Sequence, residues 1–181
     1  MRCSWCNEKN KLYVQYHDSE WAIPVYDDRT LFEFLVLETF QSGLSWEVVL
    51  NKREAFKRAF CNFDYNIVSS YNDQKISELI ANKEIIRSER KIKAAVLNAN
   101  VFIKIKSEWG SFANYIWHFT ENAIIYENDK THSALSNLIS EDLKAYGMKF
   151  VGTTVIYSYL QAIGVIYSHE DNCYLCKKHL D

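Results

Sequence analysis

The chain has 181 residues, of which 48% are hydrophobic, and its formal net charge is −2. This composition predicts a single globular domain, with room for two helical lobes that share one core. Proteins that coat nucleic acids are usually basic, so any nucleic-acid site here must be a local patch. No apolar run reaches the ~18 residues of a membrane span and no secretion signal opens the sequence, so we expect a soluble, cytoplasmic monomer.

The spacing of apolar residues favours helices. Apolar positions recur every three or four residues, strand-like alternation is nearly absent, and the chain has one proline, which together predict an all-α fold. Residues 1–26 carry several aromatic rings, among them Trp5, Tyr13, Tyr16 and Trp21. Taken alone, an aromatic cluster of this kind belongs to a core more often than to a binding site.

Residues 31–50, LFEFLVLETFQSGLSWEVVL, are the most informative stretch. Their apolar stripe continues at helical spacing to the carboxylate of Glu38, which directs a charge inward. Ser45 is a natural N-cap for a further helix that we expect to extend to about residue 60, with Trp46 in its first turn and Gly43 in the tight connection before it. A core helix pair, with Glu38 in an ion pair, would explain the same pattern.

Helix ends and connections give two further expectations. Asp27, Asp28 or Thr30 can cap the helix that carries Glu38, and Thr30 with Glu33 has the spacing of a capping box. Residues 82–93 predict a short hairpin between two helices, and residues 120–132 a polar, mobile connection. Such a hairpin can present backbone N–H groups to a phosphate, although an ordinary helix pair is an equal alternative. The basic side chains around it are Lys83, Arg87, Arg90, Lys91 and Lys93.

The five cysteines favour a metal site over a disulfide framework, because the number is odd and no export signal is present. His169 and Cys173 are four residues apart and could share one metal, with Cys3 and His17 completing a tetrahedron. All four ligands would be protein groups, so the metal would be structural and could not activate water. Free thiols are one alternative, and a site with zinc-ribbon spacing, slightly favoured by the pattern alone, is another. Its ligands would be Cys3, Cys6, Cys173 and Cys176.

The sequence contains, in order, the blocks RCSW, YHDSEWAIP, LFEFLVLETFQSGLSW, IIRSERKI, GMKFVGTT and SHEDNC. Together they resemble the 3-methyladenine DNA glycosylase I family over nearly the whole chain. The resemblance implies a helix-hairpin-helix DNA glycosylase fold. It also implies a monofunctional enzyme that hydrolyses the N-glycosidic bond of 3-methyladenine in double-stranded alkylated DNA. A catalytically silent, zinc-stapled module that binds DNA or a protein through the same pocket is the alternative function.

The same matching implies particular site residues. One structural zinc ion per chain would join the N- and C-terminal segments through Cys3, His17, His169 and Cys173. The base pocket would comprise Trp5, Tyr13, Tyr16, Trp21, Glu38 and Trp46. The loop that enters the DNA stack would contain Gln41, Gly43 and Leu44, and we expect further DNA contacts from Arg87, Arg90 and Lys91. A flipped, cationic base would gain from both the aromatic faces and the carboxylate.

Three features depart from the family pattern. Cys6 and Cys176 are extra thiols, which keep the four-cysteine site as an alternative. The other two departures are single positions. Ala22 stands where a glycine usually ends the YHDSEW block, and alanine suits that position only if its φ angle is negative. Glu84 replaces a glycine in the hairpin, where an anion would oppose an approaching phosphate.

Overall fold

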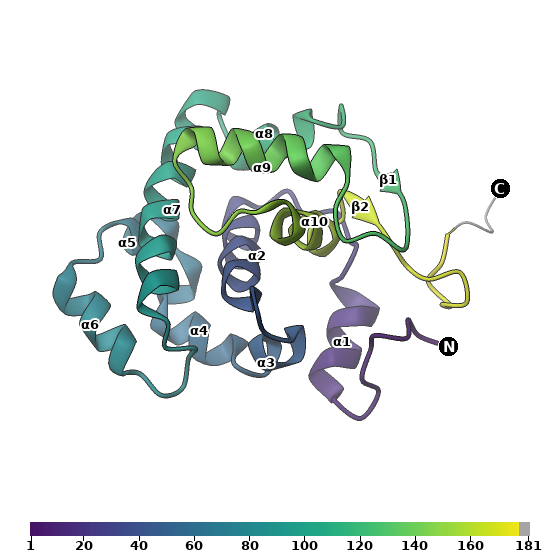
Figure 1. Ribbon diagram of the computed structural model, residues 1–181, viewed down its shortest axis with the longest axis horizontal. Helices are drawn as coiled ribbons and strands as arrows, with labels where there is room; N and C mark the ends of the chain where they lie inside the picture. Colours follow the sequence, from purple (N-terminus) through teal and green to yellow (C-terminus); the bar gives the residue numbers. More distant parts are fainter. Residues whose placement is uncertain (178–181) are drawn as a thin grey trace.

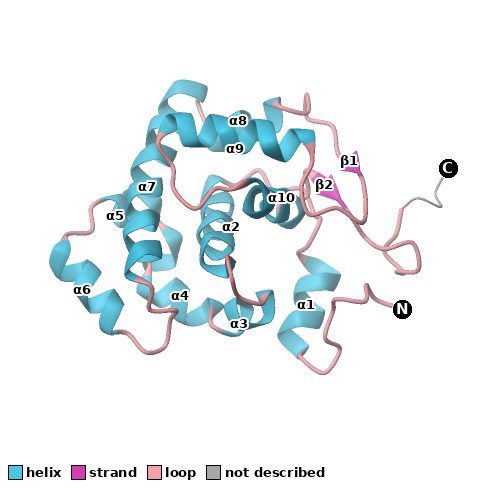
Figure 2. Ribbon diagram, viewed as in Figure 1, coloured by secondary structure: helices cyan, strands magenta, loops and turns pink. Residues whose placement is uncertain are grey.

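The computed structural model describes residues 1–177, and over this range the fold is almost entirely helical (Figure 1). The α-helices are α1 (Lys11–Ser19), α2 (Asp28–Gln41), α3 (Trp46–Asn51), α4 (Arg53–Ala59), α5 (Tyr65–Ser69), α6 (Asp73–Ala81), α7 (Glu89–Trp109), α8 (Phe112–His118), α9 (Ala134–Tyr146) and α10 (Thr153–Ala162). A 3-10 helix, η1, spans Cys61–Phe63. Strands β1 (Ile125–Tyr126) and β2 (Ile166–Tyr167) form a parallel pair, the one departure from the predicted all-α class within residues 1–177 (Figure 2). No helix in this range has the length and apolar character needed to cross a membrane.

Helix α2 runs through the centre of the molecule (Figure 1). Every residue from Leu31 to Phe40 is buried, because helices α7, α8 and α10 pack around it. A helix that is mostly apolar on all sides is suited to such a position. Its two internal carboxyl groups, Glu33 and Glu38, are therefore carried into the interior.

The capping box predicted from Thr30 and Glu33 does not form. Asp27 is the N-cap of α2, and its carboxylate accepts hydrogen bonds from the backbone N–H and the hydroxyl of Thr30, both at 2.8 Å. Because the helix begins at Asp28, Glu33 lies beyond the first turn and cannot reach back to the N-cap. Glu33 instead forms an ion pair with Arg53 at 2.7 Å.

The helix expected from Ser45 to about residue 60 is broken at Lys52 into α3 and α4. Lys52 has a φ of −103° and a ψ of 0°, outside the helical range. The break turns Phe56 of α4 against Phe40, with 4.7 Å between their ring centroids. Packing of these rings, which the local sequence does not reveal, competes here with continuation of the helix.

The connection between α8 and α9, predicted to be polar and mobile, is partly ordered by the strand pair. Ile125–Tyr126 pairs in register with Ile166–Tyr167, and the Glu127 N–H extends the ladder by donating to the carbonyl of Tyr167 at 3.2 Å. The ladder therefore holds residues 127–130 beside the C-terminal segment.

The first and last described segments lie side by side (Figure 1). The Tyr174 N–H donates to the carbonyl of Met1 at 2.9 Å. The backbone N–H and hydroxyl of Ser4 both donate to the carboxylate of Glu170, at 2.7 and 2.6 Å. These two segments consequently form one unit.

The condition for an unstrained alanine at position 22, a negative φ, is not met, because the φ of Ala22 is 61°. This left-handed conformation carries a penalty for any residue with a Cβ, which explains why glycine suits the position. The conformation lets the Ala22 N–H donate to the carbonyl of Gln161, at 3.0 Å, as the chain crosses the end of α10.

Gly164 lies where the chain crosses the end of α10, so a substitution there tests how closely the two segments pack. Its φ is 76°, and an added Cβ would lie 2.4 Å from the carbonyl carbon of Ile23 and from the nitrogen of Pro24, both backbone atoms. We expect Gly164→Ala to lower the free energy of unfolding by roughly 2–5 kcal/mol, since a left-handed penalty adds to overpacking. Urea denaturation would measure the loss.

Gly43→Ala is the matched control, because Gly43 also has a positive φ, 80°, but an added Cβ would meet no atom within 4 Å. Only the conformational penalty of about 1–2 kcal/mol applies there. Equal losses in the two variants would contradict the importance of the close approach at Gly164.

Candidate active site and metal centre

A cavity of about 300 Å³ opens beside the C-terminal half of α2. Its wall is built from the N-terminal segment, α1, the start of α3, α10 and the segments that follow β1 and β2. The structure brings together in this wall all six residues predicted for the base pocket. They are Trp5, Tyr13, Tyr16, Trp21, Glu38 and Trp46.

Aromatic rings form one side of the cavity. The ring centroid of Trp5 lies 4.7 Å from that of Trp21 and 5.5 Å from that of Tyr13, and the ring centroid of Tyr16 lies 5.1 Å from that of Trp46. Burial raises the pKa of Tyr13 to about 12 and that of Tyr16 well above its ordinary value. At neutral pH these side chains therefore offer uncharged rings on which a planar ligand can stack, with hydroxyls that can donate hydrogen bonds.

Glu38 reaches the cavity, and no cation of residues 1–177 pairs with it. The residue is 3% exposed, and its Oε2 atom has no hydrogen-bond partner among residues 1–177. Burial raises the pKa of this carboxyl group to about 8. Arg53 is paired with Glu20 and Glu33 instead. The alternative of a core ion pair at Glu38 is therefore wrong, and an unpartnered buried carboxyl group is typical of a functional site.

Sequence reasoning missed the polar side of the cavity. These residues come from the segment after β1, from α10 and from the segment after β2, and the strand pair joins the first of these segments to the last. They are Asn128, Asp129, Lys130, Ser158, Gln161, Ser168 and Glu170. No local pattern marks them, because the proximity of residues 128–130 to residues 158–170 depends on tertiary contacts. With Glu38, Asp129 and Glu170 in its lining, the cavity suits a cation more than an anion.

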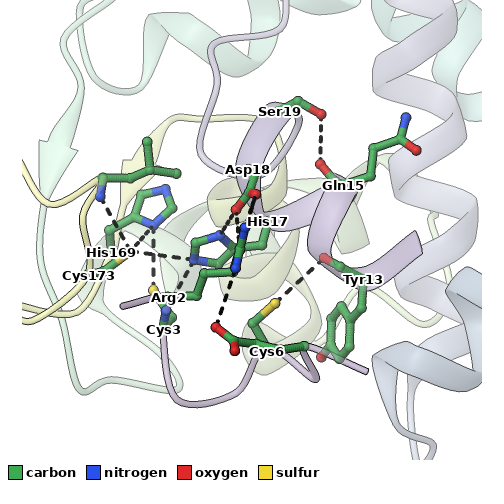
Figure 3. Close-up of polar contacts among 12 residues, drawn as sticks. Arg2, Cys3, Cys6, Tyr13, Gln15, His17, Asp18, Ser19, His169 and Cys173 are labelled. Carbon is green, nitrogen blue, oxygen red and sulfur yellow. Dashed lines mark hydrogen bonds and ion pairs between the residues drawn. The ribbon is translucent and has the colours of Figure 1, made fainter. Parts of the chain in front are cut away.

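A second cluster lies behind the aromatic wall and contains Cys3, His17, His169 and Cys173, all buried. Their ligand atoms lie within 4.8 Å of one another, and Figure 3 shows the four side chains converging. Three sulfur–nitrogen distances are 3.5 Å. Zinc–sulfur and zinc–nitrogen bonds of about 2.3 and 2.0–2.1 Å in a tetrahedron give S···N edges of about 3.5–3.6 Å, so the donor set fits such an ion.

The surroundings of the cluster orient its ligands. His17 donates from Nδ1 to Asp18 at 2.8 Å, which leaves Nε2 facing the cluster. Arg2 holds Asp18 in turn, with its closest contact at 2.8 Å (Figure 3), and hydrogen bonding to Arg2 keeps the pKa of that carboxyl group well below its ordinary value. The Glu170 N–H donates to the sulfur of Cys3 at 3.4 Å. A carboxylate behind a histidine is a usual arrangement around metals.

The extra cysteines are not in the cluster. Cys6 donates from Sγ to the carbonyl of Tyr13 at 3.8 Å, and the only metal-competent group among residues 1–177 omits both Cys6 and Cys176. The geometry therefore favours the Cys/His arrangement over the four-cysteine one. Asp18 was missed by sequence reasoning, although its place next to His17 in the YHD block was a usable signal.

Aromatic contacts join the cluster to the cavity. Trp5 packs on His17 with 5.2 Å between ring centroids, and Trp21 packs edge-on against His169 at 4.7 Å. Both tryptophans also line the cavity. Loss of order in the cluster would therefore be transmitted to the pocket wall.

The residues expected to contact DNA fall into two neighbouring places. Gly43 and Leu44 lie in the connection between α2 and α3, where Leu44 is 40% exposed, and Gln41, the last residue of α2, donates from Nε2 to the Leu44 carbonyl at 3.0 Å. Arg87 and Arg90 are both exposed, the first just before α7 and the second in its first turn. An exposed leucine at the tip of a braced turn is suited to insertion between stacked bases.

Lys91 and Glu84 are already engaged by the protein. The ammonium group of Lys91 donates to the carbonyls of Phe40 and Ser42, at 2.9 and 2.5 Å, so it braces the end of α2. The carboxylate of Glu84 faces Arg58 at 3.3 Å, in an exposed pair, and partial neutralisation by Arg58 reduces its opposition to a phosphate.

Comparisons with known proteins agree with this geometry. A family model described as methyladenine glycosylase matches residues 5–177. DNA-3-methyladenine glycosylase 1 of Escherichia coli (strain K12) is 35% identical over 178 residues, which cover 95% of each protein. A crystal structure of a 3-methyladenine DNA glycosylase I has a TM-score of 0.92 at 35% identity, over 97% of this chain and 99% of that one. A variant of such an enzyme in complex with 3-methyladenine has a TM-score of 0.91 at 31% identity, over 96% of each chain.

The mostly helical fold is thus that of solved 3-methyladenine DNA glycosylase I structures. The chain belongs to the methyladenine glycosylase family.

The carboxyl group of Glu38 predicts a pH-dependent stability. Its pKa is about 8 in the folded protein and about 4.3 in the unfolded chain, so the folded state binds more protons and loses stability as pH rises between these values. Glu38→Gln removes this loss. The stability advantage of the variant over the unmodified protein should grow with pH by up to about 1.4 kcal/mol per unit between pH 5 and 8. Urea denaturation across this range measures it, and a constant difference would contradict the burial of an unbalanced carboxyl group.

Proposed function

We propose that this protein is a monofunctional DNA glycosylase that releases 3-methyladenine from double-stranded alkylated DNA. The observation that carries the proposal is an aromatic pocket with an unpaired buried carboxyl group, Glu38. The E. coli relative named DNA-3-methyladenine glycosylase 1 supports the same activity, as does the similar enzyme in complex with 3-methyladenine. The alternative, a catalytically silent binding module, would keep the fold and the pocket but release no base.

The pocket is suited to a flipped, cationic base. An adenine alkylated at N3 carries a positive charge while it is attached to deoxyribose. The rings of Tyr16 and Trp46 offer it stacking and cation–π attraction. The cation also favours ionisation of Glu38, because an opposite charge within ~4–6 Å lowers a carboxyl pKa. An unmodified, neutral adenine would not compensate the buried charge.

Hydrolysis then needs little chemical assistance. The bond between the base and sugar C1′ breaks with its electron pair leaving on the base, which becomes neutral. Water adds to C1′ and releases one proton to solvent. Lys130 is the one amine in the pocket lining formed by residues 1–177, and its pairing with Glu127 at 2.5 Å supports attack by water instead of by an amine nucleophile.

DNA binding would combine the turn at Gly43–Leu44 with the hairpin. Helices α6 and α7 pack together, and the connection of residues 82–88 between them supports a helix-hairpin-helix that meets the backbone through its N–H groups. Leu44 would fill the space left by the flipped nucleotide. Lys91 would position this turn by holding the carbonyls of Phe40 and Ser42.

Glu38 would read the exocyclic amine of the base. Adenine offers a donor at N6, whereas guanine has the O6 acceptor at that position. An unmatched buried acceptor costs about 1–3 kcal/mol, so we expect 3-methyladenine to be released roughly five- to over a hundredfold faster than 7-methylguanine. The test is chromatography of the bases released from methylated DNA over time.

Glu38→Gln is the matched variant, because it keeps the shape but removes the charge and adds a donor. We expect it to release 3-methyladenine more slowly and to discriminate less between the two bases. Full activity of Glu38→Gln, or equal release of both bases by the unmodified protein, would assign Glu38 a purely structural role. No release of any base would favour the silent module.

We also propose that Cys3, His17, His169 and Cys173 hold one zinc ion. The S···N distances of 3.5 Å and the tetrahedral donor set support this assignment. Bound zinc would supply a structural cross-link between the chain ends and no catalytic water, because all four positions are protein groups. The residues themselves orient Trp5 and Trp21 toward the pocket through His17 and His169.

Metal analysis of purified variants tests the zinc site. We expect one zinc per chain in the unmodified protein and in Cys6→Ser, and none in Cys3→Ser or His17→Ala. A free metal concentration of 100 times Kd stabilises by about 2.7 kcal/mol, so loss of zinc should lower Tm by roughly 5–10 °C. Zinc lost in Cys6→Ser but kept in His17→Ala would establish the four-cysteine site instead.

A further inference from the structure

A second, shallower groove of about 560 Å³ lies along the N-terminal half of α7. The connection between α9 and α10 passes beside α7 here and forms the other wall (Figure 1). Its floor is apolar and its rim is basic. The lining residues are Arg90, Lys93, Ala94, Leu97, Lys149 and Phe150.

A buried side chain of α7 holds the groove wall that carries Lys149. Asn98 of α7 is 2% exposed, and its side-chain amide makes two hydrogen bonds to the Lys149 backbone. Nδ2 donates to the carbonyl at 2.9 Å, and Oδ1 accepts from the N–H at 2.8 Å. This buried amide fixes the backbone of Lys149. The next residue, Phe150, has a left-handed φ of 57°. The guanidinium carbon of Arg90 lies 5.8 Å from the Phe150 ring centroid.

The charged side chains along the rim are all cations, and one of them is paired with a carboxylate. Lys93 is paired with Glu89 at 2.5 Å. Arg90 and Lys149 are exposed, and neither forms an ion pair with a carboxylate of residues 1–177. In a protein of net charge −2, unbalanced cations on both walls of one groove form a local anion-attracting patch.

Neighbouring residues of α7 connect the groove to the turn that would enter DNA. Arg90 precedes Lys91, whose ammonium group bonds the carbonyl of Ser42, next to Gly43. A duplex seated on the Gly43–Leu44 turn would therefore bring its backbone past this face of α7. Deoxyribose suits an apolar floor, and phosphates on either side of it suit cations on the two walls.

We propose that this groove holds a sugar–phosphate segment of the duplex, with Arg90 and Lys149 each contacting a phosphate from opposite walls. The proposal rests on the proposed function, because it takes duplex DNA as the substrate. To the DNA contact expected of Arg90, it adds a second wall outside the hairpin and the turn, formed by Lys149 and Phe150. Lys149 and Phe150 position DNA and do not touch the reacting atoms.

The test is the salt dependence of binding to a short fluorescein-labelled duplex, measured by fluorescence anisotropy for Arg90→Gln, Lys149→Gln and the double variant. Each phosphate contact contributes about −0.9 to the slope of log K against log salt. We expect each single variant to make the slope shallower by about 0.9 and the double variant by about 1.8. Binding of free 3-methyladenine should not change.

Lys104→Gln is the matched control. It removes the same charge from the same helix, about 21 Å along the axis from Arg90 at 1.5 Å per residue, and Lys104 contacts the Tyr146 ring instead of the groove. The control should keep the unmodified slope. Slopes unchanged in Arg90→Gln and Lys149→Gln, or reduced equally in Lys104→Gln, would overturn the proposal.

Base release separates this proposal from the proposed function. If the unmodified protein releases 3-methyladenine but the groove variants keep its salt slope, the groove proposal fails alone. If the slopes change as expected while no base is released, the groove binds DNA and the proposed glycosylase activity fails. Thermal unfolding of each variant verifies that the fold is intact.

Discussion

The pocket depends on the carboxyl group of Glu38, which is buried and pairs with no cation of residues 1–177. Glu38 reaches this position because α2 is buried on every side, so its side chain cannot turn to solvent. Burial opposes ionisation until an opposite charge arrives, which makes the pocket more favourable for a cationic base than for a neutral one. A functional site that destabilises the free protein is a common compromise between stability and activity.

The Cys/His cluster supports the opposite wall of the pocket. Trp5 and Trp21 lie between the cavity and the cluster residues His17 and His169, so the wall depends on the joining of distant segments, as the 166-residue separation of Cys3 and His169 illustrates. Hydrogen bonds such as that from Tyr174 to Met1 reinforce this join. Site geometry and the folding of the chain ends are consequently coupled.

Much of the fold and part of the site could be predicted from sequence. Helical spacing indicated the all-α core and the inward carboxyl group, and the family-like sequence blocks pointed to the aromatic residues. Local patterns failed where tertiary packing competes with them. Phe56 packs on Phe40 where the helix breaks at Lys52, Glu33 pairs with Arg53 in place of a capping box, and strand pairing brings Asn128 and Ser168 to one cavity. Such contacts are set by distant residues, which no window of sequence contains.

The state of Glu38 itself tests the central claim most directly. Carbon-13 NMR of protein labelled at glutamate side-chain carboxyl carbons would follow each group through a pH titration, with Glu38→Gln identifying the resonance. A midpoint near 8 for that resonance is expected from burial without a cation. A midpoint near ~4, the value of a solvated glutamate, would contradict the claim, because Glu38 would then be balanced or hydrated in the free protein.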